Sequence, residues 1–396
     1  MREMKDSKIA WIGSIPKNWN IYRNKNAFTC SKEIVGDRSS TTQLLSLTTK
    51  GVKEKDINNA EGKLPETFDT YQIVKTNNLI MCLFDLDVSA VFSGISSFDG
   101  MISPAYKVLS CRKDVYPQYA DYWFKYIGHG RKFNHYAKNI RYTLNIDEFQ
   151  SLPMLFPPLE EQKRIAEYLD SKCSKIDEII SKQEQIIEKL KEYKLSVITE
   201  AVTKGLDPNV EMKDSGVEWI GQCPEKWILS KAKYYVVITN GSDPQTEGDI
   251  PVYGSGEKSF KTCGEFKEGP SVLIGRKGAT LHIPHYIEGS YWNVDTAFDV
   301  KAKDGMVLKY YYYLATCFDY KQYISQTTLP GMTQTNYNNM IIPVPDVQEQ
   351  NKIVNWLNLK IRQIDNLIER ITYLTDRKKE YKKSLIYEVV TGKKEV

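Results

Sequence analysis

Two long stretches of the chain repeat apolar residues at three-and-four spacing, which predicts two long amphipathic helices. The first covers residues 161–203 and the second covers residues 349–391, and neither contains Gly or Pro. Prolines precede each stretch and a glycine follows it, as helix start and stop signals do. At 1.5 Å per residue, each helix would be about 65 Å long.

A helix of this length with one apolar stripe needs a partner that covers the stripe. The other copy is the natural partner, as a coiled coil, and a pseudo-two-fold relation between the copies would make the pair antiparallel. The apolar spacing assigns the following residues to the seam: Leu169, Ile176, Ile180, Ile187, Leu190, Val197, Leu357, Ile364, Ile368 and Leu385.

The two helices belong to a larger internal repeat. Residues 161–203 align without a gap on 349–391, at an offset of 188. A second pair of segments, 3–19 and 211–227, is identical at ten of 17 positions and returns the pattern Trp-Ile-Gly-x-x-Pro-x-x-Trp. The order is therefore Trp box, domain, helix, and then the same three parts again. We expect the second Trp box to help dock the second domain and the first box to meet the end of the second helix.

The stretches between the repeated segments, 20–156 and 228–343, show no obvious similarity to each other. Both alternate short apolar runs with Gly-rich turns, which predicts mixed domains. The first domain is expected to hold strands over 79–94 and an aromatic helix over 117–130. The second is expected to hold a strand and turn over 233–244, a hairpin-like pair over 271–285 and a helix over 308–326.

The expected fold class is α+β, with two mixed α/β domains joined by two long helices in an antiparallel coiled coil. The pseudo-two-fold repeat divides the chain into four parts. These are a first domain over 1–156, a helix over 157–205, a second domain over 206–343 and a second helix over 344–396.

Composition and charge narrow the class of protein. Seven scattered cysteines without a CxxC pair argue against a disulfide framework and a zinc site. No stretch has the length and apolarity of a signal peptide or a membrane span, so we expect a cytoplasmic protein. The net charge of +4 neither proves nor excludes a nucleic-acid partner, because such a partner needs positive charge on one face only.

One segment of each domain has the residue types that DNA recognition uses. Residues 131–142 combine basic, aromatic and Asn side chains without an acid, although an ordinary basic loop would look similar. Residues 321–339 are rich in Gln, Asn and Thr, which can read base edges, although a polar loop is an equal alternative. With the turn at 240–242 and the Gly-flanked basic pair at 276–277, the candidate DNA-binding residues are Arg131, Lys132, Asn134, Lys138, Asn139, Arg141, Tyr142, Asn240, Ser242, Arg276, Lys277, Gln326, Thr328, Gln334, Thr335 and Asn336.

We find no motif for catalysis or for metal binding. The single Pro-Pro pair lies in Phe156–Leu159, without the Asp or Asn and the aromatic neighbour of an adenine methyltransferase, and no GxxxxGK[ST] loop occurs. His282 and His285 flank Pro284 without a nearby Cys or carboxylate partner. An enzyme with an unrecognised nuclease or methyltransferase site remains an alternative, as does a coiled-coil scaffold without DNA contact.

The order and duplication of these motifs resemble the specificity subunit (HsdS) of type I restriction–modification systems. The Trp boxes at 11–19 and 219–227 are similar to those of that family. So are the passage from Pro158 through Glu161 and Gln162, its copy from Pro345 through Glu349 and Gln350, and the turn at 238–244. The resemblance implies a non-catalytic subunit in which two target-recognition domains each read half of an asymmetric, bipartite DNA site.

The resemblance also implies partners and cofactors. The helix pair would set the gap between the half-sites and dock two modification subunits that carry S-adenosylmethionine and methylate adenine. Restriction subunits that use ATP and Mg and cleave DNA would join that core. No cofactor is expected in this chain.

Overall fold

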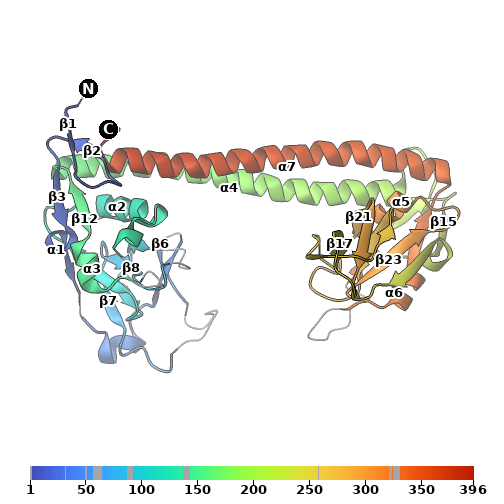
Figure 1. The fold of residues 1–396 in the computed structure, drawn as a ribbon, viewed down its shortest axis with the longest axis horizontal. Helices are drawn as coiled ribbons and strands as arrows, with labels where there is room; N and C mark the ends of the chain where they lie inside the picture. The colour runs from blue at the N-terminus through green and yellow to red at the C-terminus, as the bar shows by residue number, and fades with distance from the viewer. Residues whose placement is uncertain are drawn as a thin grey trace. The chain divides into compact units, whose positions relative to one another are not determined.

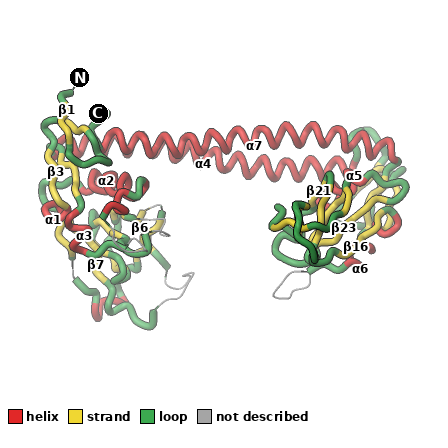
Figure 2. Tube along the Cα trace, in the orientation of Figure 1, coloured by secondary structure: helices red, strands yellow, loops and turns green. Residues whose placement is uncertain are grey.

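The computed structural model describes residues 2–31, 33–49, 51–56, 65–86, 92–136, 143–256, 258–320, 323 and 331–396, the side chains of 134 and 135 excepted. These residues form two compact units, shown in Figures 1 and 2. The first unit combines Met1–Lys182 with Leu374–Val396, and the second contains Gln183–Tyr373. The boundary between the units falls within both long helices, so each unit holds one domain and parts of both helices.

The two predicted long helices are confirmed. Helix α4 spans Leu159–Lys204 and helix α7 spans Val347–Val390, so their ends differ from the predicted ones by one or two residues. No helix in the described part of the chain has the length and apolarity needed to cross a membrane.

The two helices pair antiparallel in each unit. In the first unit, Nζ of Lys382 lies 2.6 Å from Oδ2 of Asp177, and in the second, Nζ of Lys194 lies 2.8 Å from Oδ1 of Asp365. The two lysines occupy equivalent positions of the repeat, as do the two aspartates. Each unit therefore carries the same ion pair. Because the pairs are partly exposed, each contributes at most about 1 kcal/mol, and the apolar seam must supply most of the stability.

The predicted seam residues turn toward the interior to different degrees. Three of them, Ile187, Leu190 and Ile368, are half-buried. The others are buried: Leu169, Ile176, Ile180, Val197, Leu357, Ile364 and Leu385. Leu385 joins the core of the first domain together with Leu169, and Leu357 joins the core of the second together with Val197. The seam is thus continuous with the core of a domain in each unit.

The first domain is built from short strands and helices. Its strands are β1 (Met4–Asp6), β2 (Ser14–Pro16), β3 (Asn20–Arg23), β4 (Phe28–Cys30), β5 (Leu45–Thr48), β6 (Gly51–Glu54), β7 (Gln72–Val74), β8 (Leu79–Met81), β9 (Ser93–Ile95), β10 (Gly100–Ile102), β11 (Lys107–Cys111) and β12 (Pro153–Phe156). Its helices are α1 (Asn24–Ala27), α2 (Pro117–His129) and α3 (Ile146–Ser151), with 3-10 turns η1 (Gly36–Ser40) and η2 (Lys132–His135).

The second domain has a similar inventory. Its strands are β13 (Met212–Asp214), β14 (Gln222–Pro224), β15 (Ile228–Lys231), β16 (Val236–Asn240), β17 (Ile250–Tyr253), β18 (Lys261–Cys263), β19 (Lys267–Glu268), β20 (Ser271–Gly275), β21 (His285–Ile287), β22 (Ser290–Asn293), β23 (Ala297–Ala302) and β24 (Ile341–Val344). Its helices are α5 (Leu308–Cys317) and α6 (Gln334–Asn339), with a 3-10 turn η3 (Ala232–Tyr234).

The two domains share one topology, which the sequence did not reveal. Each contains a four-stranded antiparallel sheet, in the order β4-β11-β8-β9 in the first and β16-β23-β20-β21 in the second. In each, a helix (α2 or α5) follows the last strand of that sheet, and a short helix (α3 or α6) precedes the strand that leads into the long helix. The domains differ in their additional strands, β5–β7 and β10 in the first and β17–β19 and β22 in the second.

The Trp boxes join the domains to the long helices. In the first unit, Trp19 is buried and its Nε1 donates to Oε2 of Glu161 at 3.1 Å, near the start of α4. Trp19 and Pro16 also lie against Gly392, just beyond the end of α7. The prediction that the first box meets the end of the second helix is therefore confirmed. In the second unit, the equivalent Trp227 donates to Glu349 at 3.0 Å.

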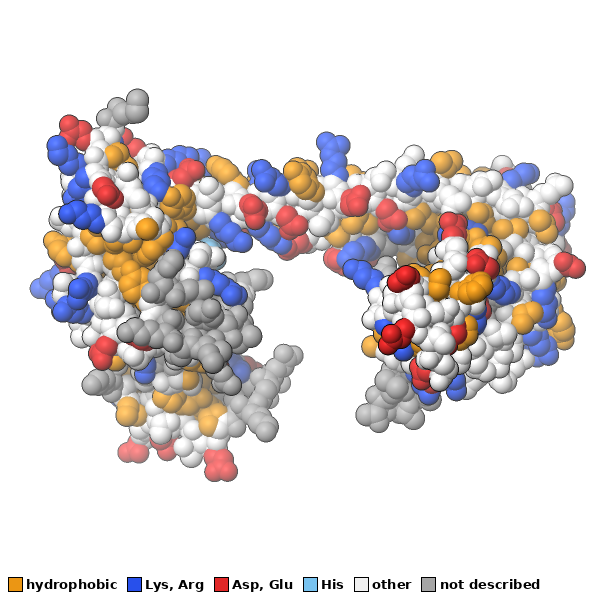
Figure 3. Space-filling model, in the orientation of Figure 1, with side chains coloured by type: hydrophobic (Ala, Val, Ile, Leu, Met, Phe, Trp, Pro, Cys, Tyr) orange, Lys and Arg blue, Asp and Glu red, His pale blue; other side chains and the backbone are white. Residues whose placement is uncertain are grey.

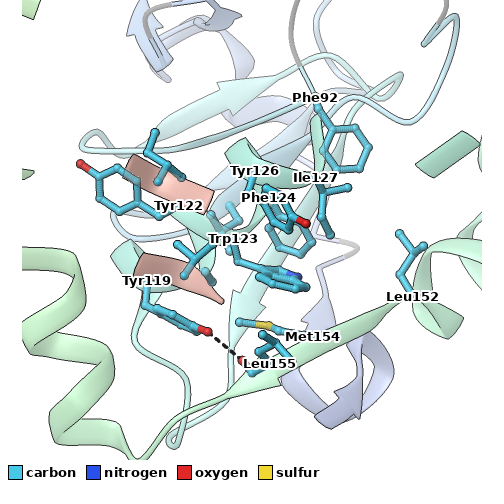
Figure 4. Close-up of a cluster of buried hydrophobic side chains, with 14 of the residues drawn as sticks. Phe92, Tyr119, Tyr122, Trp123, Phe124, Tyr126, Ile127, Leu152, Met154 and Leu155 are labelled. Carbon is cyan, nitrogen blue, oxygen red and sulfur yellow. Dashed lines mark hydrogen bonds between the residues drawn. The ribbon is translucent and has the colours of Figure 1, made fainter. Parts of the chain in front are cut away.

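Helix α2 supplies the aromatic centre of the first domain, drawn in Figure 4. Pro117 occupies its first turn, where the missing N–H costs nothing, and the buried side chains that follow it include Tyr119, Trp123 and Phe124. The Tyr119 hydroxyl donates to the carbonyl of Leu155 at 3.0 Å, so this buried polar group is satisfied. The predicted aromatic helix over 117–130 is confirmed.

The helix predicted over 308–326 is wrong in its length. Helix α5 ends at Cys317, and Phe318 has an extended conformation. Phe318 is buried and packs edge-on against Trp219 and Tyr311, so aromatic packing overrides the helical pattern there. The strands predicted over 79–94 are reduced to β8 and the start of β9 among the described residues, whereas the strand over 233–244 and the pair around 271–285 are confirmed as β16 and as β20–β21.

We predict that Leu357→Ala lowers the free energy of unfolding by about 2–5 kcal/mol, because it leaves a cavity in the core. Leu357 is 0% exposed, whereas Leu359, two residues further along the same helix, is 63% exposed. The matched variant Leu359→Ala should change stability by less than about 0.5 kcal/mol. Urea titration followed by tryptophan fluorescence measures both, and equal effects would contradict the buried seam.

Candidate nucleic-acid interface

A groove of about 550 Å³ lies in the second unit, where β16, β20 and β23 meet α6. Its side chains come from segments far apart in the sequence, and the sheet brings them together. The lining residues are Asn240, Arg276, Lys277, Phe298, Tyr323, Gly331, Met332, Thr333, Gln334 and Asn336. The groove thus gathers five of the predicted DNA-binding residues, whereas the predicted Ser242 and Thr335 are exposed outside it.

Arg276 is the most constrained basic residue of this groove. It follows β20, and its backbone N–H donates to the carbonyl of Thr296 at 2.8 Å. Its Nη1 donates to the carbonyl of Asp295 at 3.4 Å, and its guanidinium lies 5.7 Å from the centre of the Phe298 ring. A cation held over an aromatic face keeps its orientation, so the guanidinium is pre-organised.

Lys277 has a looser setting beside Arg276. Its Nζ lies 3.7 Å from Oδ2 of Asp295, and both side chains are about half exposed. An exposed pair at this distance is weak, at about 0–1 kcal/mol, so the ammonium remains available to an external anion.

Two amide side chains of α6 line the groove, and the nitrogen of each donates a hydrogen bond to the protein. Nε2 of Gln334 donates to the carbonyl of Ile238 on β16, and Nδ2 of Asn336 donates to the carbonyl of Tyr323 at 3.3 Å. Thr333 caps α6 by accepting from the backbone N–H of Asn336. These bonds fix which end of each amide points at the protein.

The buried Tyr337 supports the groove by packing against Phe298, one of its lining residues. Its hydroxyl donates to the carbonyl of Gly275 at 2.7 Å, and its ring packs edge-on against Phe298. Burial raises the pKa of Tyr337 far above its usual value, with a further contribution from Tyr311. The hydroxyl therefore stays protonated and remains a donor at every physiological pH.

The turn that ends β16 requires its glycine. A Cβ at Gly241 would lie 2.2 Å from the carbonyl oxygen of Val294 and 2.5 Å from Asn293, so a larger residue would displace the turn. The N–H of Ser242 donates to the carbonyl of Asn293, and Nε1 of Trp292 donates to the carbonyl of Ser242 at 2.7 Å. Ser242 therefore holds the turn through its backbone, which orients Asn240.

In the first unit, the predicted DNA-binding residues have different surroundings. Arg131 has a left-handed conformation with φ of 46°, and it lines a separate cavity of about 590 Å³ together with Lys125 and His129. Burial lowers the pKa of His129, and the lysines at 383, 382 and 125 lower it further, so its imidazole is neutral at pH 7. Lys132 is half-buried, and its aliphatic stem lies against Gly130.

Several predicted residues lie outside the described part of the chain. They are Lys138, Asn139, Arg141 and Tyr142 in the first domain and Gln326 and Thr328 in the second, and the side chain of Asn134 is also outside it. In chain order, both groups fall on the connection that leads from α2 to α3 or from α5 to α6. The two segments chosen from composition therefore hold the same place in the shared topology.

One backbone contact shows how the two domains differ at the groove. In the second domain, the N–H of Met332 donates to the carbonyl of Arg276 at 2.9 Å, and in the first, the N–H of Leu144 donates to the carbonyl of Leu83 at 2.8 Å. Leu83 thus occupies the position that Arg276 has in the second domain. The same framework carries different side chains.

Sequence reasoning missed Phe298 and Asp295, which orient the two basic residues. Phe298 lies opposite Asn240 and Ile274 in the sheet, a pairing that no local pattern predicts. Within the described part of the chain, no three His, Cys, Asp or Glu side chains come together as a metal site would need.

The second unit matches a known family of domains. Residues 228–380 match the type I restriction modification DNA specificity domain, from β15 into α7. The chain is also similar to two curated proteins of Methanocaldococcus jannaschii. It is 24% identical over 307 residues to the putative type I restriction enzyme MjaX specificity subunit, covering 71% of this chain and 69% of that protein. It is 25% identical over 277 residues to the type I restriction enzyme MjaVIII specificity subunit, covering 62% of this chain and 63% of that protein.

Solved structures share the fold over nearly the whole chain. A chain from a structure on complex assembly and conformational transition of the type I R-M system matches with a TM-score of 0.73 and 14% identity, over 96% of this chain and 99% of that one. The HsdS subunit from Thermoanaerobacter tengcongensis matches with a TM-score of 0.50 and 15% identity, over 96% and 98%.

The repeated domains, the paired helices and the matched domain are similar to those of DNA-specificity proteins of type I restriction–modification systems. The curated relatives of the chain are specificity subunits, and one of the solved structures that share its fold is an HsdS subunit.

Proposed function

We propose that each domain reads one half of an asymmetric, bipartite site on double-stranded DNA. The observation that carries the proposal is the shared topology of the two domains, whose equivalent positions carry unlike side chains, such as the buried Leu83 in the first and Arg276 in the groove of the second. A common framework explains why both domains bind the same kind of polymer. Different side chains on it explain why the half-sites would differ, because base edges are read by side-chain hydrogen bonds and apolar contacts.

The groove of the second domain has the chemistry that such reading needs. A fixed guanidinium, two amides and an available ammonium combine base-edge readers with a phosphate contact. A coiled-coil scaffold without DNA contact would have no use for this arrangement. Salt-dependent binding to DNA separates the two functions, because phosphate contacts release counterions.

The helix pair is the proposed spacer between the half-sites. Helices α4 and α7 each run from one domain into the other unit, and their seam is continuous with both cores. A rigid connection of fixed length would give the two half-sites a fixed separation.

The outer faces of the helices are the proposed docking surface for two modification subunits. Large apolar side chains recur there seven residues apart, outside the buried seam, and hydrophobic atoms reach the surface of both helices in Figure 3. The exposed residues are Ile179, Ile186 and Tyr193 on α4 and, at the equivalent positions, Leu367, Leu374 and Tyr381 on α7. Exposed apolar positions at heptad spacing suit further helices, and the two copies of the pattern suit two identical partners.

The remaining partners follow from membership in such a system. The modification subunits would hold S-adenosylmethionine and methylate adenine, and restriction subunits that use ATP and Mg would translocate and cleave. We expect the assembly to act in the cytoplasm, where its DNA lies.

Exchange of residues 20–156 for the same segment of another specificity subunit tests the proposal that each domain reads one half-site. The exchange keeps the Trp box and both helices, so one half-site should change while the other half-site and the gap remain. The readout is the motif of methylated adenine in cells that express the modification subunit. Exchange of residues 228–343 is the matched control and should change only the other half-site. An unaltered motif after either exchange would contradict the proposal.

A length change in the helix pair tests the spacer. Seven residues inserted after Leu190 in α4, with seven more after Glu369 in α7, keep the seam in register, because Lys194 and Asp365 pair at this level. The insertion adds two turns, about 10.5 Å, which should lengthen the gap by roughly three base pairs. Both half-sites should stay readable in the methylation motif. Replacement of seven residues without a length change is the control, and a gap that stays fixed after the insertion would exclude the helices as the spacer.

A further inference from the structure

The groove of the second domain is lined by side chains that offer both hydrogen-bond donors and acceptors. Arg276 offers donors, because a guanidinium has five N–H groups and no acceptor. One of them is engaged by the carbonyl of Asp295, and the Phe298 ring supports the plane of the group from one side. The side-chain carboxylate of Asp295 lies near Lys277, whereas the backbone carbonyl of Asp295 contacts Arg276. This carbonyl is neutral and engages one N–H, so Arg276 keeps most of its donors for a ligand.

The two amides of α6 that line the groove offer acceptors. Gln334 and Asn336 each donate inward through the nitrogen, to the carbonyls of Ile238 and Tyr323. The two backbone carbonyls can only accept, so they fix the nitrogen end of each amide against the protein. Because the nitrogen end is held by the protein, the oxygen is the end of each amide that we assign to a ligand.

We infer that this groove recognises a G·C base pair through its major-groove edge, with Arg276 donating to guanine and the Gln334 oxygen accepting from cytosine. The inference rests on the proposed function and adds the identity of one base pair. Guanine presents two acceptors there, N7 and O6, and its cytosine presents one donor, the N4 amino group. The donors of an arginine and the acceptor of an amide oxygen, both lining one groove, together complement this acceptor–acceptor–donor edge.

Other base pairs fit this arrangement less well. An A·T pair places a donor, the adenine amino group, next to N7, which would face the donors of Arg276. A Gln that reads adenine uses its amide nitrogen as well as its oxygen, and in Gln334 the nitrogen is held by Ile238. Lys277, which is exposed and weakly paired, is assigned to a backbone phosphate.

The experiment uses the complete complex with the modification subunits and duplexes in which each position of both half-sites is varied in turn. Arg276→Ala should lose discrimination for guanine at one position, by roughly 5- to 150-fold, the range of one bidentate contact, whereas Arg276→Lys, which can still donate to guanine, should lose less. Gln334→Met should relax the same base pair. Lys226→Ala, which removes an exposed basic side chain of the second unit outside the groove, is the matched control and should leave the profile unchanged.

A modified base identifies the contacted atom. Replacement of the guanine by 7-deazaguanine removes the N7 acceptor, which should weaken the wild-type complex and have little further effect on Arg276→Ala. Such non-additivity is the signature of a direct contact.

Two outcomes overturn the inference in different ways. If the Arg276 variants lose affinity equally for all sequences, with a weaker salt dependence, Arg276 contacts phosphate; the base assignment then falls and the proposed function stands. If the wild-type complex shows no sequence discrimination at all, the proposed function falls together with the inference.

Discussion

The two long helices and the two Trp boxes form the frame of the protein. A buried glutamine at the start of each long helix ties a recognition domain to this frame. Gln162 is 1% exposed and Gln350 is 0% exposed, and the side-chain amide of each makes three hydrogen bonds. Nε2 of Gln162 donates to the carbonyls of Asp114 and Pro157, while its Oε1 accepts from the N–H of Tyr116. Gln350 makes the same three bonds in the second unit, to the carbonyls of Gly305 and Pro345 and from the N–H of Val307.

These bonds explain why the frame could be duplicated while the domains diverged. Each glutamine joins the first turn of a long helix to the turn before α2 or α5, and it bonds only backbone atoms there. A backbone contact does not depend on the neighbouring side chains, so the domain can change its surface without losing its attachment. Removal of either amide would leave several buried backbone groups unpaired, at a cost of about 1–3 kcal/mol for each.

The frame was predictable from the sequence because its determinants are local. Apolar spacing gave the helices, and the Glu-Gln pair and the Trp boxes marked their junctions with the domains. The shared topology of the domains escaped the sequence because it rests on strand pairing between distant residues, such as Asn240 with Phe298. For the same reason, composition could nominate Arg276 but could not reveal that Phe298 and Asp295 hold its guanidinium.

The frame and the groove contribute differently to stability and to specificity. Seam residues such as Leu357 are buried with the domain cores and stabilise the fold, whereas the polar groove residues Arg276 and Gln334 are partly exposed and contribute less to it. Specificity can therefore change at Arg276 or Gln334 with little effect on stability. This separation suits a subunit that selects the sequence on which other subunits act.

The most direct measurement is a genome-wide map of methylated adenine in the host, with and without this gene. The account predicts that deletion removes one methylation motif, that the motif is bipartite with a fixed gap, and that its two halves are not palindromic copies of each other. An unchanged map, or loss of a palindromic or continuous motif, would contradict the claim that two unlike domains on one frame select the site.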